Sequence, residues 1–180
     1  SVCYNLKYLT GAYPEGDALL DLFIHPLDCM AYLFGDAKVK YVESVGKHTL
    51  MLILEHHCAT GMPELSTGYS WNDAKEQWTI NTDSGVYEMG QFDSLTFRHK
   101  PSVMMGIPME KVFPCRKATV SLYERNNFIP LQENNQIVSQ GYYDTIKGFV
   151  DAVEGKNKCT LSTFEHLIHT YSLIENIRDL

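Results

Sequence analysis

The sequence has no long hydrophobic run, and this absence limits where the protein can reside. Its longest apolar run, "LMLILE" at Leu50 to Glu55, has the length of a strand. A helix that spans a membrane needs about 20 apolar residues. The N-terminal segment "SVCYNLKYLTG" also lacks the basic start and the apolar stretch of a signal peptide. We therefore predict no membrane partner and a cytoplasmic location.

Paired cysteines are absent as well. The five cysteines are odd in number and widely spaced, and no Cys-x-x-Cys occurs, which argues against a disulfide framework or a zinc ribbon. We predict reduced thiols, some of them buried as small hydrophobic residues, and no bound metal. The five are Cys3, Cys29, Cys58, Cys115 and Cys159.

Positive charge is scarce. The chain has 15 Lys and Arg against 22 Asp and Glu, a formal net charge of −7. Nucleic acids bind clustered Lys and Arg, so nucleic acid is not an expected partner.

A length of 180 residues with 44% hydrophobic content fits one globular domain. The chain starts inside a predicted strand without an initiator Met, and we expect it to be a fragment of a longer protein.

Motifs that bind phosphate are missing from the whole sequence. It contains neither Gly-x-Gly-x-x-Gly after a strand nor Gly-x-x-x-x-Gly-Lys-Ser/Thr. The Gly-x-Ser-x-Gly elbow of many hydrolases is also absent. We therefore predict no cofactor-binding residue in this chain.

The N-terminal quarter predicts a strand followed by a helix. Residues Val2 to Thr10 alternate as a strand does, and a Gly- and Pro-rich loop follows. Asp17 occupies the N-cap position of an apolar periodic stretch that reaches Phe34. This helix is expected to bury Leu19, Leu20, Phe23, Leu27 and Met30. Pro26 inside that stretch predicts a bend just beyond His25. One face of the strand carries Tyr4, Leu6, Tyr8 and Thr10.

The middle of the chain predicts strands. From Ala37 to Lys117 the sequence is rich in β-branched and aromatic residues, and Gly- and Pro-containing segments such as "GMPE" separate the runs. We expect five or six strands of a largely antiparallel sheet. Asp83 to Gly85 is expected to form a tight hairpin turn.

Two helices are expected at the C-terminal end. The first runs from Ile137 to Val153 and ends at Gly155, and the second is capped by Thr160 or Ser162. Helices separated from a run of strands indicate an α+β fold: a large open, mainly antiparallel or mixed sheet with helices covering one face. The last helix is expected to bury Phe164, Leu167, Ile168, Tyr171, Ile174 and Ile177.

Asp21 and His25 are the candidate catalytic pair. Four positions apart on the predicted helix, they share one side of it. Near the positive end of the helix dipole, an aspartate is held ionised and can orient an imidazole. Histidine is the usual general acid or base near neutral pH. The same spacing fits a structural role, with Asp21 satisfying backbone donors and His25 packed on the sheet.

A second histidine pair offers a weaker signal. His166 and His169 form His-x-x-His on the last predicted helix. Neither His-Glu-x-x-His nor a third ligand accompanies them, so we interpret them as surface histidines rather than metal ligands.

Two segments resemble the C-terminal domain of the Gfo/Idh/MocA oxidoreductase family. "YPEGDALLDLFIHPLDCMAYLFGD" is similar to the opening signature of that domain, a glycine-rich turn followed by Asp-x-x-x-His, a second Asp and Leu-Phe-Gly. "GYYDTIKGFVDAVEGKNKCTLSTFEHLIHTYSLIENI" is similar to its closing helices, so the resemblance brackets the chain. Two departures concern the first segment: Glu15-Gly16-Asp17 replaces a glycine run, and Phe23 occupies a common glycine position. That ring either narrows the pocket or fills the core.

The resemblance implies a dihydrodipicolinate-reductase-like domain over residues 1–180, without the N-terminal Rossmann domain that binds NAD or NADP in the family. It implies hydride transfer between the nicotinamide and a sugar, polyol or similar hydroxy compound. His25 would be the acid/base and Asp21 the residue that tunes it. The family's catalytic lysine, in a Glu-Lys-Pro segment of the Rossmann domain, has no counterpart here. Family members pair through the exposed sheet face, so a homodimer is expected.

We therefore predict the substrate-binding and dimerisation domain of an NAD(P)-dependent oxidoreductase, inactive alone and unable to bind the dinucleotide tightly. Tyr13 and Asp17, in the loop before the helix, are predicted substrate contacts. One alternative is a non-catalytic ligand sensor or regulatory protein on the same scaffold. Another is an unrelated small-molecule-binding α+β domain with an accidental Asp-x-x-x-His match.

Overall fold

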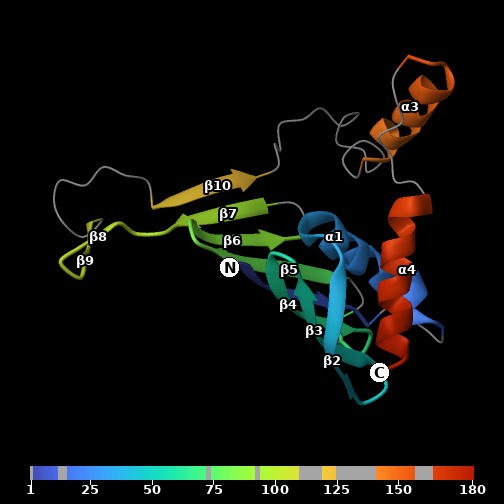
Figure 1. The fold of residues 1–180 in the computed structure, drawn as a ribbon, viewed down its shortest axis with the longest axis horizontal. Coiled ribbons are helices and arrows are strands. Elements are labelled where there is room, and N and C mark those ends of the chain that lie inside the picture. The colour runs from blue at the N-terminus through green and yellow to red at the C-terminus, as the bar shows by residue number, and fades with distance from the viewer. Residues whose placement is uncertain are drawn as a thin grey trace. The chain divides into compact units, whose positions relative to one another are not determined.

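The computed structural model describes residues 2–11, 16–71, 74–91, 94–109, 119–124, 141–156 and 164–180. The chain divides into two compact units, of which the first is Ser1–Glu124 with His169–Leu180 and the second is Arg125–Ile168. The first unit contains the sheet and helix α1, and the second contains helix α3 (Figure 1).

An eight-stranded sheet dominates the first unit. Its strand order is β10-β7-β6-β5-β1-β4-β3-β2, with β1 between β5 and β4. The β1–β4 pair is parallel, and the other recorded pairs of this sheet are antiparallel, so the predicted α+β fold with an open mixed sheet is confirmed. The strands are β1 Val2–Leu9, β2 Ala37–Val45, β3 Thr49–His56, β4 Ala59–Ser66, β5 Lys75–Thr82, β6 Gly85–Gly90, β7 Ser94–His99 and β10 Val120–Glu124.

In the described part of Ala37 to Lys117, six strands (β2 to β7) lie in this sheet, so the expected number of five or six is confirmed, although one of them was not foreseen. The strand not foreseen is β4, in which "GMPE" is strand and not turn. Pro63 has no N–H to donate, and the β3–β4 register accommodates it with a gap between Met51↔Glu64 and Leu54↔Gly61. The predicted hairpin turn is confirmed, since Thr82 pairs with Gly85 across it.

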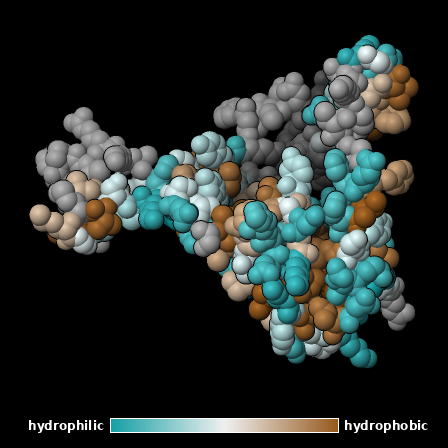
Figure 2. All heavy atoms as spheres, viewed as in Figure 1, coloured by the Kyte–Doolittle hydropathy of each residue, from teal (hydrophilic) through white to brown (hydrophobic). Residues whose placement is uncertain are grey.

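A short hairpin forms a second sheet. Strands β8 (Val103–Met104) and β9 (Ile107–Pro108) pair through a turn with positive φ at Met105 and Gly106. Figure 2 shows apolar spheres on the surface there, and Met105 is 96% exposed.

The alternation expected for β1 is confirmed. Tyr4 and Leu6 are fully buried, Thr10 just beyond the strand is 3% exposed, and Tyr8 is half-buried. The residues between them, such as Asn5 and Lys7, are exposed on the other face. Strand β1 therefore has one buried face, called the covered face below, and one exposed face, called the open face.

The helix predicted from Asp17 to Phe34, called the site helix below, does form. Its irregular segment lies before the bend that was predicted just beyond His25. Residues Leu19–Phe23 form a π-helical segment (η1), and α1 (Ile24–Phe34) follows directly. The ring of a helical proline clashes with the carbonyl four residues earlier. Pro26 therefore disturbs the turn at Leu22, and the expected bend beyond His25 is replaced by a wide turn before it.

Helix α1 packs on the covered face of the sheet. Phe23, Leu27 and Met30 are at most 2% exposed, as predicted, while Leu19 and Leu20 are only partly buried. At the far end of α1, the Phe34 ring stacks on Tyr4 with 4.3 Å between centroids. Burial of such side chains contributes roughly 1.5–3 kcal/mol each.

Helix α4 (Phe164–Arg178) contributes its last three turns to this core. Thr170, Leu173, Ile174 and Ile177 are buried. Phe164, Ile168 and Tyr171, all expected inside, are 90%, 60% and 48% exposed. The Thr170 hydroxyl donates to Asp28 Oδ1 at 2.6 Å, which ties α4 to α1. This polar contact lets a threonine occupy a core position that an apolar pattern cannot reveal.

The second unit contains α3 (Tyr142–Val153). As predicted, the helix has ended before Gly155, which has a φ of 72°. The start expected near Ile137, and the caps expected at Thr160 or Ser162, lie outside the described residues.

Three cysteines lie in the described part of the chain, and Cys3, Cys29 and Cys58 are all free thiols. Cys115 and Cys159 are outside it. None of the helices in the described ranges is long and apolar enough to cross a membrane.

Candidate functional site

Asp17 caps the site helix. Its Oδ1 accepts a hydrogen bond from the Leu19 backbone N–H at 3.1 Å, and its carbonyl accepts one from the Asp21 N–H at 3.0 Å. Its Oδ2 forms an ion pair with Arg178 of α4. The predicted N-cap is therefore confirmed, and the end of α4 is tied to the start of the site helix. Tyr13, the other predicted substrate contact, lies outside the described residues.

A small cavity adjoins this capped end. It measures about 250 Å³ and lies between the start of the helix and the β2–β3 turn, with Asp17, Phe23, Lys47 and His48 among its lining residues. His25 does not line it. The structure thus separates the surroundings of Asp17 from those of the candidate acid/base.

The candidate catalytic pair is accessible. Asp21 lies in the π-helical segment and His25 in the first turn of α1, and both side chains are exposed. Phe23 between them is 2% exposed, and its ring contacts that of Tyr8 edge-on with centroids 6.1 Å apart. The ring at the family's common glycine position therefore fills the core.

Glu76 of β5 faces the helix from the sheet. The carboxyl is half-buried, and its Oε1 accepts a hydrogen bond from the Trp78 indole N–H at 2.8 Å. Burial raises the pKa of Glu76, while the Trp78 hydrogen bond and the charge of His25 act in the opposite direction. The His25 ring is therefore within electrostatic reach of this carboxyl.

Two further titratable groups adjoin Glu76. Tyr8 is its direct neighbour in the β1–β5 register, and Cys29 lies one turn beyond His25 on α1. Burial raises the pKa of Tyr8, and the negative charge of Glu76 raises it further. The pKa of Cys29 rises to about 11 through burial and the charges of Glu76 and Asp28. Both groups are therefore neutral at physiological pH.

Sequence reasoning missed Glu76, although β5 contains a signal. Strand alternation places Glu76, Trp78 and Ile80 on one face, so an acidic residue stands where a core residue is expected. A half-buried acid with a fixed donor is typical of functional or hydrogen-bonded sites. Its pairing beside Tyr8 could not be read, because it depends on which strand neighbours β1.

Two other histidines, His56 and His169, have structural contacts. His56 Nδ1 lies 2.7 Å from the Gly35 carbonyl oxygen, and Nε2 lies 2.7 Å from the Tyr4 hydroxyl. Because a carbonyl only accepts, Nδ1 carries the proton and a neutral ring accepts from Tyr4. His169 lies 3.0 Å from Asp36. Among the residues whose placement is described, no three His, Cys, Asp or Glu side chains are grouped to hold a metal.

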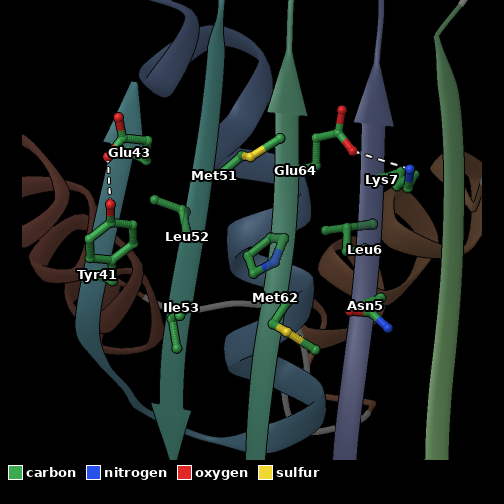
Figure 3. Close-up of a pocket in the computed structure, with 11 residues that line it drawn as sticks. Asn5, Leu6, Lys7, Tyr41, Glu43, Met51, Leu52, Ile53, Met62 and Glu64 are labelled. Carbon is green, nitrogen blue, oxygen red and sulfur yellow. Dashed lines mark hydrogen bonds and ion pairs between the residues drawn. The ribbon is translucent and has the colours of Figure 1, made fainter. Parts of the chain in front are cut away.

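The open face of the sheet carries a shallow apolar groove. It measures about 410 Å³ across β1 to β4. Figure 3 shows the Lys7–Glu64 ion pair on one side and the hydrogen bond from Tyr41 to Glu43 on the other. Between these lie exposed apolar side chains, each 39–51% accessible: Tyr41, Met51, Ile53 and Met62.

The chain is an α+β domain with an open sheet, and the helix that carries Asp21 and His25 packs on the covered face of that sheet. No family model and no curated protein matches the sequence. Solved structures do match it in fold. A dehydrogenase (MviM) from Clostridium difficile superposes with a TM-score of 0.72 at 14% identity, over 98% of this chain and 54% of that chain.

Two further matches have the same character. A Gfo/Idh/MocA family oxidoreductase from Vibrio cholerae gives a TM-score of 0.61 at 17% identity, over 97% of this chain and 50% of that chain. Levoglucosan dehydrogenase, in complex with NADH and levoglucosan, gives a TM-score of 0.67 at 13% identity, over 98% of this chain and 55% of that chain. The chain has the fold of the C-terminal domain of these dehydrogenases and spans about half of their length.

Proposed function

We propose that this chain is the substrate-binding and dimerisation domain of an NAD(P)-dependent oxidoreductase of the Gfo/Idh/MocA type. The observation that carries the proposal is the exposed His25 at the start of α1, in a fold that dehydrogenases share over 98% of the chain. The substrate class is a sugar, a polyol or a similar small hydroxy compound. Two matched structures support it: levoglucosan dehydrogenase with levoglucosan, and the WlbA dehydrogenase from Bordetella pertussis with UDP-GlcNAcA.

The proposed chemistry removes a hydride and a proton from a secondary alcohol. The balance is R₂CHOH + NAD(P)⁺ → R₂C=O + NAD(P)H + H⁺. We assign the hydroxyl proton to the His25 imidazole and the electrostatic support of that ring to Asp21. A bound dinucleotide would supply the hydride acceptor. We assign it to a Rossmann domain of the full-length protein, because the sequence contains no glycine-rich phosphate loop.

The test follows nicotinamide reduction by the full-length protein against a panel of sugars and polyols. His25→Ala is expected to lower turnover by about 10²–10⁴, the contribution of a lost acid/base. The matched control is His57→Ala, which removes an exposed histidine outside the site and leaves turnover unchanged. Unchanged turnover in His25→Ala would eliminate His25 as the proton carrier. Nucleotide and sugar binding without any turnover would favour a ligand sensor.

The open face supports the dimerisation part of the proposal. A monomer rarely exposes adjacent large apolar side chains unless they serve an interface. The groove across β1 to β4 presents four of them, with charged and polar groups at its margins. A second copy that presents the same face would cover the groove, as in most symmetric dimers.

A further inference from the structure

The cavity beside the capped start of the site helix has one apolar wall. It measures about 250 Å³, and Leu19, Phe23 and Leu50 are among its lining residues. These three side chains belong to the hydrophobic core or pack against it, so the fold holds the wall in place. An apolar wall combined with a few well-placed polar groups is typical of a small-molecule site.

The β2–β3 turn and the end of β4 form a second, polar wall, and three contacts hold it. The Thr67 backbone N–H donates to the His48 carbonyl at 2.8 Å. The Thr49 and Ser66 hydroxyl oxygens lie 2.7 Å apart. A Cβ on Gly68 would lie 2.9 Å from the His48 Cβ, so the chain after β4 packs directly on this histidine. The polar wall therefore presents its side chains from a fixed backbone.

One acidic side chain, that of Asp17, lies among the described residues that line the cavity, and both of its oxygens are engaged. Oδ1 accepts from the Leu19 N–H at 3.1 Å, and Oδ2 forms an ion pair with Arg178. The Arg178 guanidinium offsets the negative charge of Asp17. An anion in the cavity therefore meets little repulsion from the start of the helix.

Lys47 and His48 are the groups of the polar wall that can bind a ligand. Both side chains are exposed, and in the described part of the chain the Lys47 ammonium forms no ion pair. His48 Nδ1 lies 3.4 Å from the Thr67 hydroxyl oxygen. When that hydroxyl donates to Nδ1, Nε2 carries the proton and can donate to a ligand. The cavity thus offers a positive charge together with hydrogen-bond donors, the combination that binds carboxylate and phosphate groups.

We propose that this cavity binds the anionic group of a small ligand, a carboxylate or a phosphate, through the Lys47 ammonium and the His48 Nε2–H. The proposal rests on the proposed function for the sugar part of the ligand, and it narrows the substrate class to sugars that carry such a group. His25 does not line the cavity, so the anionic group is held apart from the carbon that reacts. Contacts of this kind act equally on the substrate and the transition state, and they lower KM without raising kcat.

Two simple anions test the site without any sugar. In the full-length protein labelled with ¹⁵N-lysine and ¹⁵N-histidine, the backbone amide signals of Lys47 and His48 are followed by NMR while sodium phosphate or sodium acetate is added at constant ionic strength. We expect saturable shifts, and the anion that binds more tightly identifies the group as phosphate or carboxylate.

Lys47→Met is expected to raise the dissociation constant of that anion about 10-fold or more, read from the His48 signal, because a charge-assisted hydrogen bond is lost. The matched control is Lys100→Met, which removes an exposed lysine that does not line the cavity and leaves the dissociation constant unchanged. No saturable shift with either anion would overturn the proposal. Equal dissociation constants in Lys47→Met and the wild type would overturn it as well.

Turnover shows whether the site serves the substrate. The panel is extended with D-glucuronate and D-glucose 6-phosphate, which differ from D-glucose only in the group at C6. Lys47→Met is expected to raise KM for the anionic sugars about 10-fold with kcat nearly unchanged, whereas His25→Ala lowers kcat. A lower kcat/KM for both anionic sugars than for D-glucose would overturn the narrowed substrate class.

The two proposals fail in different ways. Anion binding that depends on Lys47, together with full turnover in His25→Ala, would reject the proposed function of His25 and leave the anion site in place. Absence of saturable anion binding would reject the site, whether or not His25→Ala abolishes turnover.

Discussion

The two faces of strands β1 to β4 are built from alternate residues of the same segments, yet they differ in how much each position is constrained. On the covered face, Tyr4, His56 and Phe34 contact one another through stacking and hydrogen bonds. On the open face, Met51 and Met62 are each more than 40% exposed and line a groove. In each strand, one set of alternate residues therefore packs into the core, and the other set faces outward.

The comparison shows which residues the fold itself explains. A covered-face residue has intramolecular neighbours that determine its size and polarity. Among the described residues, the apolar side chains of the open face have no such packing to account for them, and our proposal assigns them to contact with a second copy. Three substitutions test this distinction, in order of decreasing expected effect.

The largest effect is expected at Gly61 on the covered face. A Cβ there would overlap the Tyr4 ring, which packs directly on this glycine. Gly61→Ala must displace a buried aromatic ring that also bonds His56, and we expect a loss of about 3 kcal/mol in the free energy of unfolding. Urea denaturation measures it. Gly90→Ala, in a strand position with open space around the added methyl, is the control and should change stability by less than about 1 kcal/mol. Equal effects of the two substitutions would contradict the packing explanation.

The second effect concerns association rather than folding. Ile53→Lys places a charge in the middle of the groove of the open face, where a second copy would have to bury it. We expect the dimer dissociation constant to rise by about 10²-fold or more, with the stability of the monomer nearly unchanged. Sedimentation equilibrium measures it, with Thr79→Lys on the β5 side of the same face as control. If Ile53→Lys dimerises like the wild type, the groove is not the interface.

The smallest effect is expected at the Lys7–Glu64 ion pair. The two charged groups are 3.3 Å apart, and the side chains are 56% and 29% exposed, so water and salt screen them. Lys7→Ala should cost about 0–1 kcal/mol, less at high salt. A loss above about 2 kcal/mol in thermal or urea unfolding would show that the open face is more constrained than its exposure indicates.

The sequence predicted the elements whose signals are local. The Asp17 cap, the burial of Phe23, Leu27 and Met30, and the alternation of β1 all follow from spacing along one segment. Strand β4 was missed because Gly61 and Pro63 are usual turn residues, and only the Tyr4 ring and the interrupted register explain them as strand. The pattern cannot contain this information, since it lies in a partner strand.

In the candidate site, too, only the residues whose signal lies within one segment of the chain could be predicted. Asp21 and His25 could be named because they lie on one helix, whereas Glu76 comes from a strand whose position beside β1 is a property of the whole sheet. Thr170 was missed for a related reason, because a polar residue joins the core only through its bond to Asp28. What depends on contacts between distant segments remained hidden.

The contact between Asp17 and Arg178 has a consequence for how the protein is made. These residues are 161 positions apart in the sequence, and Thr170 and Asp28 are 142 apart. Closing such long loops is slow relative to forming local helices and hairpins. On the ribosome, the start of the site helix gains its Arg178 partner only after the 161 residues that follow Asp17 have been synthesised. The start of that helix therefore reaches its final form late, when the rest of the sheet is already able to fold.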